Sequence, residues 1–213
     1  MLRPLTNRGR HFIVISMNVD ESLFLAINGL AGHVPAVDTF FLFLSGSSSL
    51  YLPVALASGY WMWVNWREAL IGGAVLAGVV GFVDFLGGQL KWVFERVRPC
   101  RALDQAVVVG PGKCGVLFSF PSNHAVNTAS AAAFLQVLYP KSGWVTWPIV
   151  VLVGFSRIYV GAHYVSDVLG GWAIGGCIGA GVAWLLLHWP QFRRRSVPPP
   201  APTRTQIPVS HNS

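Results

Sequence analysis

Three short segments of this 213-residue chain hold most of the polar side chains that could carry out chemistry. They are residues 91–99 (KWVFERVRP), 121–124 (PSNH) and 156–167 (SRIYVGAHYVSD). Together they supply lysine, arginine, histidine, serine and aspartate, which are the side chains that bind a phosphate group and transfer it to a nucleophile. This concentration of polar groups in an otherwise apolar chain predicts where a functional site lies.

The cations of these segments predict an anion site. Lys91, Arg98 and Arg157 would repel one another at one place unless an anion lay among them. Lysine offers a point charge, and arginine offers a planar fork that matches phosphate oxygens. Ser122 follows a proline and opens a predicted helix, so its hydroxyl and the first unpaired N–H groups of that helix would face the same anion. We therefore expect a phosphate-binding pocket.

The histidines add nucleophilic or acid–base chemistry. His163 and Asp167 are four residues apart, which puts them on one face of a helix. A carboxylate that holds one ring N–H fixes the tautomer and leaves the other nitrogen to attack. His124 would protonate the leaving oxygen, while Arg157 and Lys91 would stabilise charge on the phosphoryl group. We find no cluster of ligands that needs a metal, and we expect no metal and no cofactor.

Composition indicates which elements must position these residues. Charged residues make up 11% of the chain and hydrophobic residues 53%, with a mean hydropathy of +0.53, whereas a soluble domain carries about 25% charged residues. This excludes a disordered, collagen-like or coiled-coil chain, argues against a cytosolic globular protein and favours a helical membrane protein. The net charge of +7 would suggest nucleic acid for a soluble protein. In a membrane protein we expect no nucleic acid partner, but membrane lipids and a lipid phosphate substrate.

Apolar stretches predict an all-α fold, a polytopic transmembrane helical bundle. A span needs about 20 residues, and the five predicted spans are residues 50–66, 69–90, 125–139, 144–159 and 168–189. Residues 1–35 are expected to form an N-terminal tail with an interfacial helix or a sixth span. Residues 36–190 would form the transmembrane domain, and residues 191–213 a disordered tail rich in arginine and proline.

Counting spans places all three polar segments on one membrane face. One span ends at Lys91, the next begins near Ser122 and runs away, and a returning span ends near Arg157. Basic residues on the opposite face indicate, by the positive-inside rule, that the site faces the periplasm or the outside; they are Arg67, Lys141 and residues 193–195. On that side Cys100 and Cys114 could form a disulfide, with two free thiols as the alternative.

The three segments resemble the signature of the type 2 phosphatidic acid phosphatase and haloperoxidase superfamily, which reads K-x6-RP, PSGH and SR-x5-H-x3-D. The match departs from this signature at Asn123, where the family has glycine. The resemblance implies a metal-independent phosphatase. The histidine that matches His163 attacks phosphorus and becomes a phosphohistidine, the aspartate that matches Asp167 supports it, and the histidine that matches His124 protonates the leaving group. The residues that match the phosphate binders are Lys91, Arg98, Ser122, Asn123 (through its backbone N–H) and Arg157.

We therefore expect a phosphatase of the inner (plasma) membrane that removes the terminal phosphate of a lipid phosphate or diphosphate. The resemblance and the outward site make undecaprenyl diphosphate the first choice of substrate. Phosphatidylglycerophosphate, phosphatidate and the lipid A phosphate are the alternatives. A vanadium haloperoxidase fits less well because those enzymes are soluble, and a non-enzymatic lipid binder or transporter would show degraded motifs. The sequence does not predict the oligomeric state.

Three features lie outside the signature, and the first two have competing interpretations. Asp84, an acidic residue inside a predicted span, is either functional or a buried hydrogen-bond partner of a neighbouring helix. Small residues four apart predict close helix packing within the monomer, with a dimer contact as the alternative; they are Gly171, Gly175 and Gly179. Anionic lipid headgroups are the expected partners of the remaining basic residues near the site, Arg96, Arg101 and Lys113.

Overall fold

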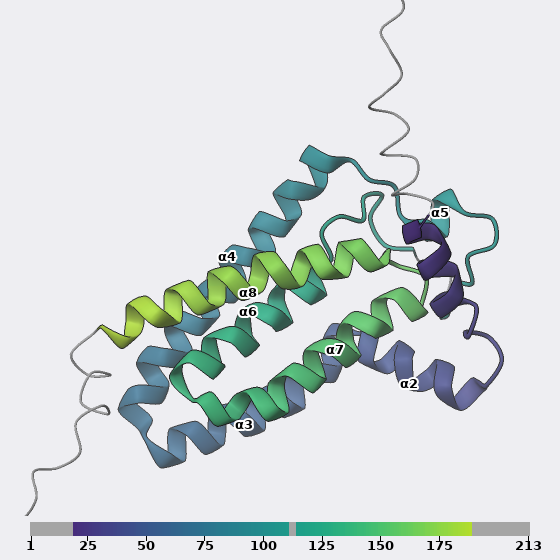
Figure 1. Ribbon diagram of the computed structural model, residues 1–213. Coiled ribbons are helices and arrows are strands. Elements are labelled where there is room, and N and C mark those ends of the chain that lie inside the picture. The colour runs from purple at the N-terminus through teal and green to yellow at the C-terminus, as the bar shows by residue number, and fades with distance from the viewer. Residues whose placement is uncertain (1–18, 111–113, 189–213) are drawn as a thin grey trace, which may run out of the picture.

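The computed structural model describes residues 19–110 and 114–188, which form a bundle of helices (Figure 1). These residues form no β-strand, and strand-like pairing among them is limited to an isolated bridge between Val97 and Phe118. The all-α prediction is therefore confirmed. The predicted C-terminal tail, Lys113 and most of the predicted N-terminal tail lie outside the described residues.

The helices follow one another along the chain with short connections, except for the long segment between α5 and α6. Their order is a helix at residues 19–28, α2 (Pro35–Ser45), the 3-10 turn η1 (Ser47–Leu50), α3 (Tyr51–Val64), α4 (Trp66–Phe94), α5 (Pro99–Ala102), α6 (Asn123–Leu138), the 3-10 turn η2 (Pro140–Ser142), α7 (Gly143–Tyr159) and α8 (Val165–Leu187).

Local signals set the ends of α4, the longest helix. Asn65 caps its start, because the side-chain oxygen accepts the backbone N–H of Glu68 at 3.3 Å. Glu95 ends it in the left-handed conformation, with φ of 46°. The chain then leaves the helix axis, and Arg96 to Arg98 turn back toward the other helices.

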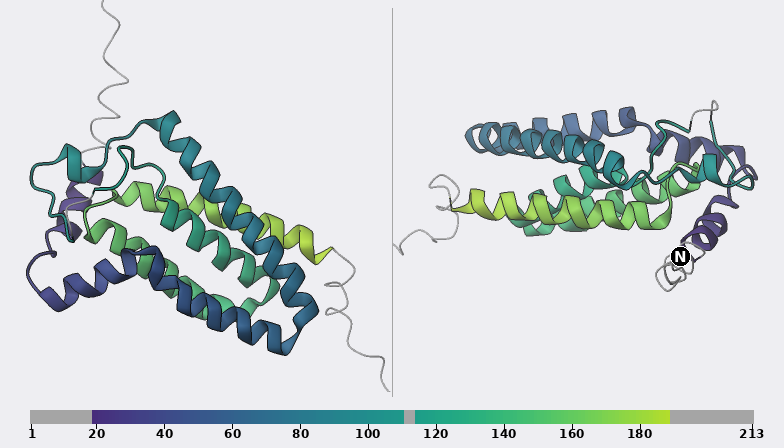
Figure 2. Two further views of the ribbon diagram at one scale, coloured as in Figure 1. Left: turned by 180° about the vertical axis from the view of Figure 1, so that it is seen from behind. Right: turned by 90° about the horizontal axis from the view of Figure 1, so that it is seen from above.

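α6 is the central helix and contacts α4, α7 and α8. It can be surrounded in this way because its buried positions are mostly small, with Ala125, Ala129, Ala132, Ala133 and Ser130 among them. Helices α3 and α4 form a hairpin that lies as a separate layer beside α6 and α8 (Figure 2, right). The α4–α6 connection, the α7–α8 link and the helix at residues 19–28 gather at one end of the bundle (Figure 1).

The outer surface of the bundle is apolar. α4 (29 residues) and α8 (23 residues) are long and apolar enough to cross a membrane, and only 22% and 28% of their most apolar stretches are buried in the protein. Large apolar side chains also point outward, among them Trp63 of α3, Phe85 of α4 and Trp144 of α7. An apolar surface of this extent is suited to lipid rather than to water.

The number of spans stays a prediction. Within the described residues only α4 and α8 meet the criteria of length and apolarity for a span, while α3, α6 and α7 have 14, 16 and 17 residues. The helix at residues 19–28 is too short to cross an apolar core of about 30 Å. It packs on the bundle instead, with Phe24 fully buried against Tyr164 at 5.7 Å between ring centroids.

The glycines of α8 bring that helix against α6 of the same chain. A Cβ atom on Gly175 would collide with the backbone oxygen of Val126, and one on Gly179 would collide with the backbone oxygen of Ser130. Gly171 likewise lies against the backbone of α6, at Ser122. The prediction that these glycines pack within the monomer is confirmed.

Gly175→Ala should therefore destabilise the protein, since a methyl group at this position must push α8 away from α6. We expect a loss of about 1–3 kcal/mol, typical of overpacking, measured as a lower midpoint of thermal unfolding in detergent. The matched control is Gly176→Ala, because a Cβ atom there meets nothing within 4 Å. Equal unfolding midpoints for the two variants would contradict the close contact.

Candidate active site

The predicted site residues meet at the end of the bundle where α4 ends, α6 and α8 begin, and α7 ends. Hydrogen bonds and close contacts connect residues of all three polar segments there. The structure brings together Lys91, Arg98, Ser122, Asn123, His124, Arg157, His163 and Asp167. This agrees with the convergence expected from counting spans.

The carboxylate of Asp167 faces the Nδ1 side of the His163 ring. Its Oδ2 is 3.5 Å from His163 Nδ1, and both side chains are buried. The pair does not sit on one helical turn as the four-residue spacing suggested, because His163 precedes α8 and lies in the α7–α8 link. Asp167 instead folds back over the start of α8, where Oδ2 accepts the backbone N–H of Tyr164 at 2.9 Å.

Arg98 contacts the other ring nitrogen of His163. Its Nη1 is 3.1 Å from His163 Nε2 and also donates to the backbone oxygen of Ala162 at 3.0 Å. A guanidinium only donates, so Nε2 is the acceptor and Nδ1 carries the ring proton toward Asp167. Burial, together with the charges of Arg98 and Arg157, holds the pKa of His163 well below its usual value of 6.5. The ring is therefore neutral at pH 7, with its lone pair on Nε2.

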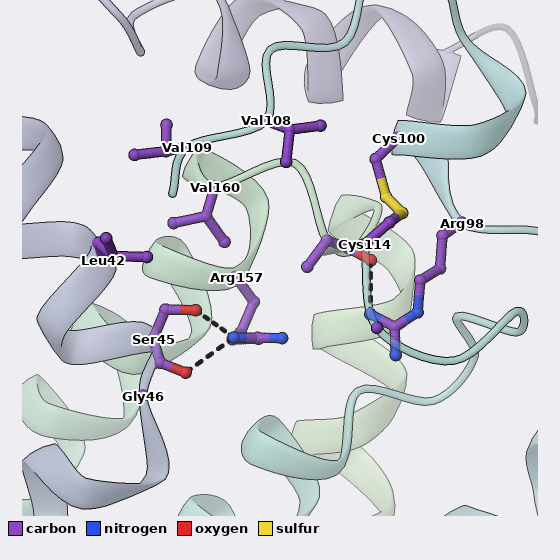
Figure 3. Close-up of a pocket in the computed structure, with 12 residues that line it drawn as sticks. Leu42, Ser45, Gly46, Arg98, Cys100, Val108, Val109, Cys114, Arg157 and Val160 are labelled. Carbon is purple, nitrogen blue, oxygen red and sulfur yellow. Dashed lines mark hydrogen bonds between the residues drawn. A yellow bond between two sulfur atoms is a disulfide. The ribbon is translucent and has the colours of Figure 1, made fainter. Parts of the chain in front are cut away.

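Oxygen acceptors hold the other two cations. Lys91 Nζ donates to the backbone oxygen of Pro121 and to Asn123 Oδ1, the latter at 2.7 Å. Arg157 Nη1 donates to the backbone oxygen of Ser45 at 2.8 Å and to its hydroxyl (Figure 3). Neutral acceptors fix the positions of these cations without cancelling their charge. The pocket therefore keeps a positive potential that suits an anion.

Several buried polar atoms of the site have no hydrogen-bond partner among the described residues. They are Ser122 Oγ, His124 Nε2 and Arg157 Nε; His163 Nδ1 is also without a hydrogen bond, but it faces Asp167. Buried polar atoms are nearly always paired in folded proteins. Hydroxyl, imidazole and guanidinium groups beside three cations are the groups that bind phosphate oxygens.

Asn123, which stands where the signature has glycine, is the first residue of α6 and has its own partners on α4. Its Oδ1 accepts from Lys91, and its Nδ2 donates to Asp84 Oδ1 at 2.9 Å and to the Asp84 backbone oxygen at 3.0 Å. The side chain fits because it lies over Gly87, where a Cβ atom would come within 2.9 Å of Oδ1. Asp84 also accepts from Asn127 Nδ2 at 2.8 Å. It is thus a hydrogen-bond partner of α6, but on an exposed side and not a buried one.

The assignment of Arg96 to lipid headgroups is wrong. Its Nη1 donates to Asp167 Oδ1 at 2.9 Å, its Nη2 donates to Asp20 Oδ2 at 2.6 Å, and its guanidinium lies 4.0 Å from the centroid of the Tyr164 ring. The sequence signal was limited to the place of Arg96 within the polar segment 91–99, two residues before Arg98. Its partner Asp20 lies 76 residues away, which no local pattern reveals.

Asp20 connects the N-terminal helix to the site. Its Oδ1 accepts the backbone N–H of Ser166 at 3.0 Å, and its Oδ2 accepts the Ser166 hydroxyl at 2.5 Å. Ser166 lies in the first turn of α8, where a carboxylate compensates unpaired N–H groups. The helix at residues 19–28 therefore belongs to the framework of the site.

A disulfide braces the segment that carries Arg98. Cys100 and Cys114 are bonded, with their Cα atoms 6.1 Å apart, so the pairing left open by the sequence is settled. Arg98 Nε donates to the backbone oxygen of Val116 at 2.6 Å, two residues beyond the disulfide. A cavity of about 230 Å³ lies between this disulfide, α2 and the end of α7, with Arg98 and Arg157 on its wall (Figure 3).

The described residues contain no group of three or more His, Cys, Asp or Glu side chains that could hold a metal ion. The groups that the site offers for chemistry are a neutral histidine, a second histidine and a cationic pocket.

Comparisons with known proteins show what this chain is similar to. The family model described as the PAP2 superfamily matches residues 69–195. A lipid A 4'-phosphatase of Porphyromonas gingivalis is 31% identical over 76% of this chain and 71% of its own. An undecaprenyl-diphosphatase of Sulfolobus acidocaldarius is 31% identical over 77% of this chain and 76% of its own.

A solved structure extends the likeness to three dimensions. The crystal structure of a transmembrane PAP2-type phosphatidylglycerolphosphate phosphatase from Bacillus subtilis matches with a TM-score of 0.61 and 29% sequence identity, over 81% of this chain and 86% of that one. The family match takes in every predicted site residue and covers more than half of the chain. The chain therefore belongs to the PAP2 superfamily, among its membrane lipid phosphatases.

Proposed function

We propose that this protein hydrolyses the terminal phosphate of a membrane lipid through a phosphohistidine on His163. The observation that carries the proposal is the contact of 3.1 Å between Arg98 and His163 Nε2. It fixes the lone pair on the nitrogen that would attack and sets a phosphate-binding arginine beside that atom. Asp167 on the opposite side of the ring supports the same tautomer.

The proposed reaction has two steps. In the first, a bond forms between His163 Nε2 and phosphorus while the bond from phosphorus to the lipid oxygen breaks. The leaving oxygen keeps the electron pair and takes a proton from His124. In the second, water attacks phosphorus and gives a proton to His124, and the bond to Nε2 breaks to release orthophosphate. Lys91, Arg98 and Arg157 stabilise the charge on the phosphoryl oxygens in both steps.

Within this mechanism Arg96 is a positioning residue. It touches neither the nucleophilic nitrogen nor the pocket cations, but it holds Asp167 Oδ1 while Tyr164 N–H holds Oδ2. Two donors leave the buried carboxylate one orientation, the one that faces His163 Nδ1. Arg96 also orders Asp20 and with it the start of α8.

The relatives' names cover both lipid diphosphates and lipid monophosphates. Lipid monophosphates and lipid diphosphates both carry one terminal phosphate, which is the group that the pocket of Lys91, Arg98 and Arg157 would bind. The disulfide supports a site that faces the periplasm or the outside, since disulfides persist in oxidising compartments. The positive-inside rule leads to the same expected orientation of the site.

His163→Ala should abolish phosphate release, because it removes the proposed nucleophile. We expect a fall in kcat of about 1,000-fold or more, together with loss of the acid-labile phosphoenzyme trapped from radiolabelled substrate. His188→Ala, at the far end of α8, is the control and should keep wild-type turnover. A folded His163→Ala protein with near wild-type turnover would contradict the mechanism.

Phosphate release should persist when divalent cations are removed. The proposed steps use only protein side chains and water, so dialysis of the purified protein against EDTA should change kcat by less than about twofold. The assay follows orthophosphate with and without added magnesium. A strict requirement for a divalent cation would rule out this form of the mechanism.

Arg96→Gln should lower kcat by about 10- to 100-fold and leave KM within a few-fold, because it frees Asp167 without removing a phosphate ligand. Arg96→Lys should recover part of the loss, since it keeps the charge but not the fork that reaches two carboxylates. Arg67→Gln removes a cation at the opposite end of α4 and serves as the control. A rise in KM with unchanged kcat would show that Arg96 binds substrate instead.

A further inference from the structure

The carboxylate of Asp84 is linked to the phosphate pocket through Asn123, which bonds both Asp84 and Lys91. It precedes Lys91 by seven residues on α4, which is two helical turns, or roughly 10 Å, farther from the end of the bundle that holds the site. Its side chain is exposed on the surface of α4. Asn123 and Asn127 of α6 both donate to its Oδ1, at 2.9 and 2.8 Å. Those two amides fix the carboxylate, and its Oδ2 can accept a hydrogen bond from a substrate.

Asp84 also adjoins the proposed general acid. His124 lies between Asn123 and Asn127 along α6, and the charge of Asp84 acts on both His124 and Lys91. If His124 protonates the leaving oxygen, that oxygen lies beside His124. The lipid that carries it must continue from there toward the apolar surface of the bundle. Its first atoms therefore pass Asp84.

The charges of the long helices make this position distinctive. Helices α3, α4, α6, α7 and α8 contain few charged or histidine side chains. Those at the site are Lys91, His124, Arg157 and Asp167, and those at the start of α4 are Arg67 and Glu68. Asp84 lies between these two places. In the proposed complex the three cations of the pocket surround the transferred phosphoryl group. The next charged side chain, on the side of the leaving group, is the carboxylate of Asp84.

This arrangement separates two classes of substrate. A lipid diphosphate has a second, charged phosphate as its leaving group, and that phosphate would lie beside the Asp84 carboxylate. A lipid monophosphate has a neutral alcohol there, and any hydroxyl on that alcohol can donate to Oδ2. Like charges placed together at a recognition site are an effective way to reject a ligand.

We propose that Asp84 is a specificity-determining residue that makes this protein select lipid monophosphates with a neutral alcohol leaving group over lipid diphosphates. The inference rests on the proposed function and on the role of His124 in it. It reverses the order of substrates expected from the sequence, where undecaprenyl diphosphate came first.

The test uses two lipids that differ only in the leaving group, phosphatidate and diacylglycerol pyrophosphate with the same acyl chains. Orthophosphate release from each in detergent micelles gives two values of kcat/KM for the full-length protein. The wild type should prefer phosphatidate. Asp84→Asn keeps an oxygen that accepts from both amides but removes the charge, and it should shift the ratio toward the pyrophosphate by about tenfold or more.

Two further variants separate charge from hydrogen bonding. Asn127→Ala removes one amide that holds Asp84 but keeps the carboxylate, so its ratio should stay within about twofold of the wild type. Asp84→Glu keeps the charge and should also keep the preference for phosphatidate. If Asp84→Asn proves inactive, Asp84→Ser provides a second neutral variant, expected to show the same shift.

The outcomes are distinct. A wild type that prefers the pyrophosphate, or neutral variants whose ratio stays at the wild-type value, would overturn the role of Asp84 while leaving the phosphatase intact. Loss of both activities in Asp84→Asn and Asp84→Ser would show that the carboxylate is needed for hydrolysis itself and would overturn a role in selection. A wild type that releases phosphate from neither lipid, nor from other lipid phosphates, would overturn the proposed function and this inference with it.

Discussion

The site depends on one buried carboxylate, that of Asp167. Its side chain has no exposed surface, and it accepts from Arg96 and from the backbone of Tyr164 while it faces His163. Its backbone oxygen accepts the N–H of Ser122 at 3.1 Å, which ties the start of α8 to the start of α6. A charge this deeply buried is tolerable only when several donors surround it. The hydrogen bonds of Asp167 therefore align the elements that carry the proposed nucleophile, the cationic pocket and, through Arg96, the N-terminal helix.

The cations of the pocket, unlike Asp167, bond mainly to neutral groups. Arg98 and Arg157 bond mainly to backbone oxygens and hydroxyls, and Lys91 bonds to a backbone oxygen and an amide. Neutral acceptors hold these groups in place, and the three cations outnumber the two carboxylates that act on them, Asp84 and Asp167. The site is thus rigid before substrate arrives, and its potential is directed at one position. The disulfide and the contact with Val116 extend this rigidity to the loop that carries Arg98.

The substitution of asparagine for the signature glycine at position 123 is accommodated by α4. Asn123 lies over Gly87 and connects Lys91 to Asp84, so a cation of the pocket and a carboxylate of α4 become parts of one hydrogen-bonded group. In the proposed complex this group would set positive charge beside the phosphoryl group and negative charge beside the leaving group. Asn123 is the residue that connects the two charges.

The sequence by itself determined the helical class, the apolar outer surface and the identity of the residues that meet at the site. These follow from composition, from motif spacing and from the order of apolar stretches, all of which are local or additive along the chain. The packing of Gly175 and Gly179 within the monomer was likewise predicted from the four-residue spacing of small residues. Only the tertiary structure decided that Arg96 pairs with Asp20 and Asp167, that Arg98 contacts His163 Nε2, and that Asp84 joins α6. Such pairings link residues tens of positions apart, and they depend on helix crossings and side-chain directions that no local pattern records.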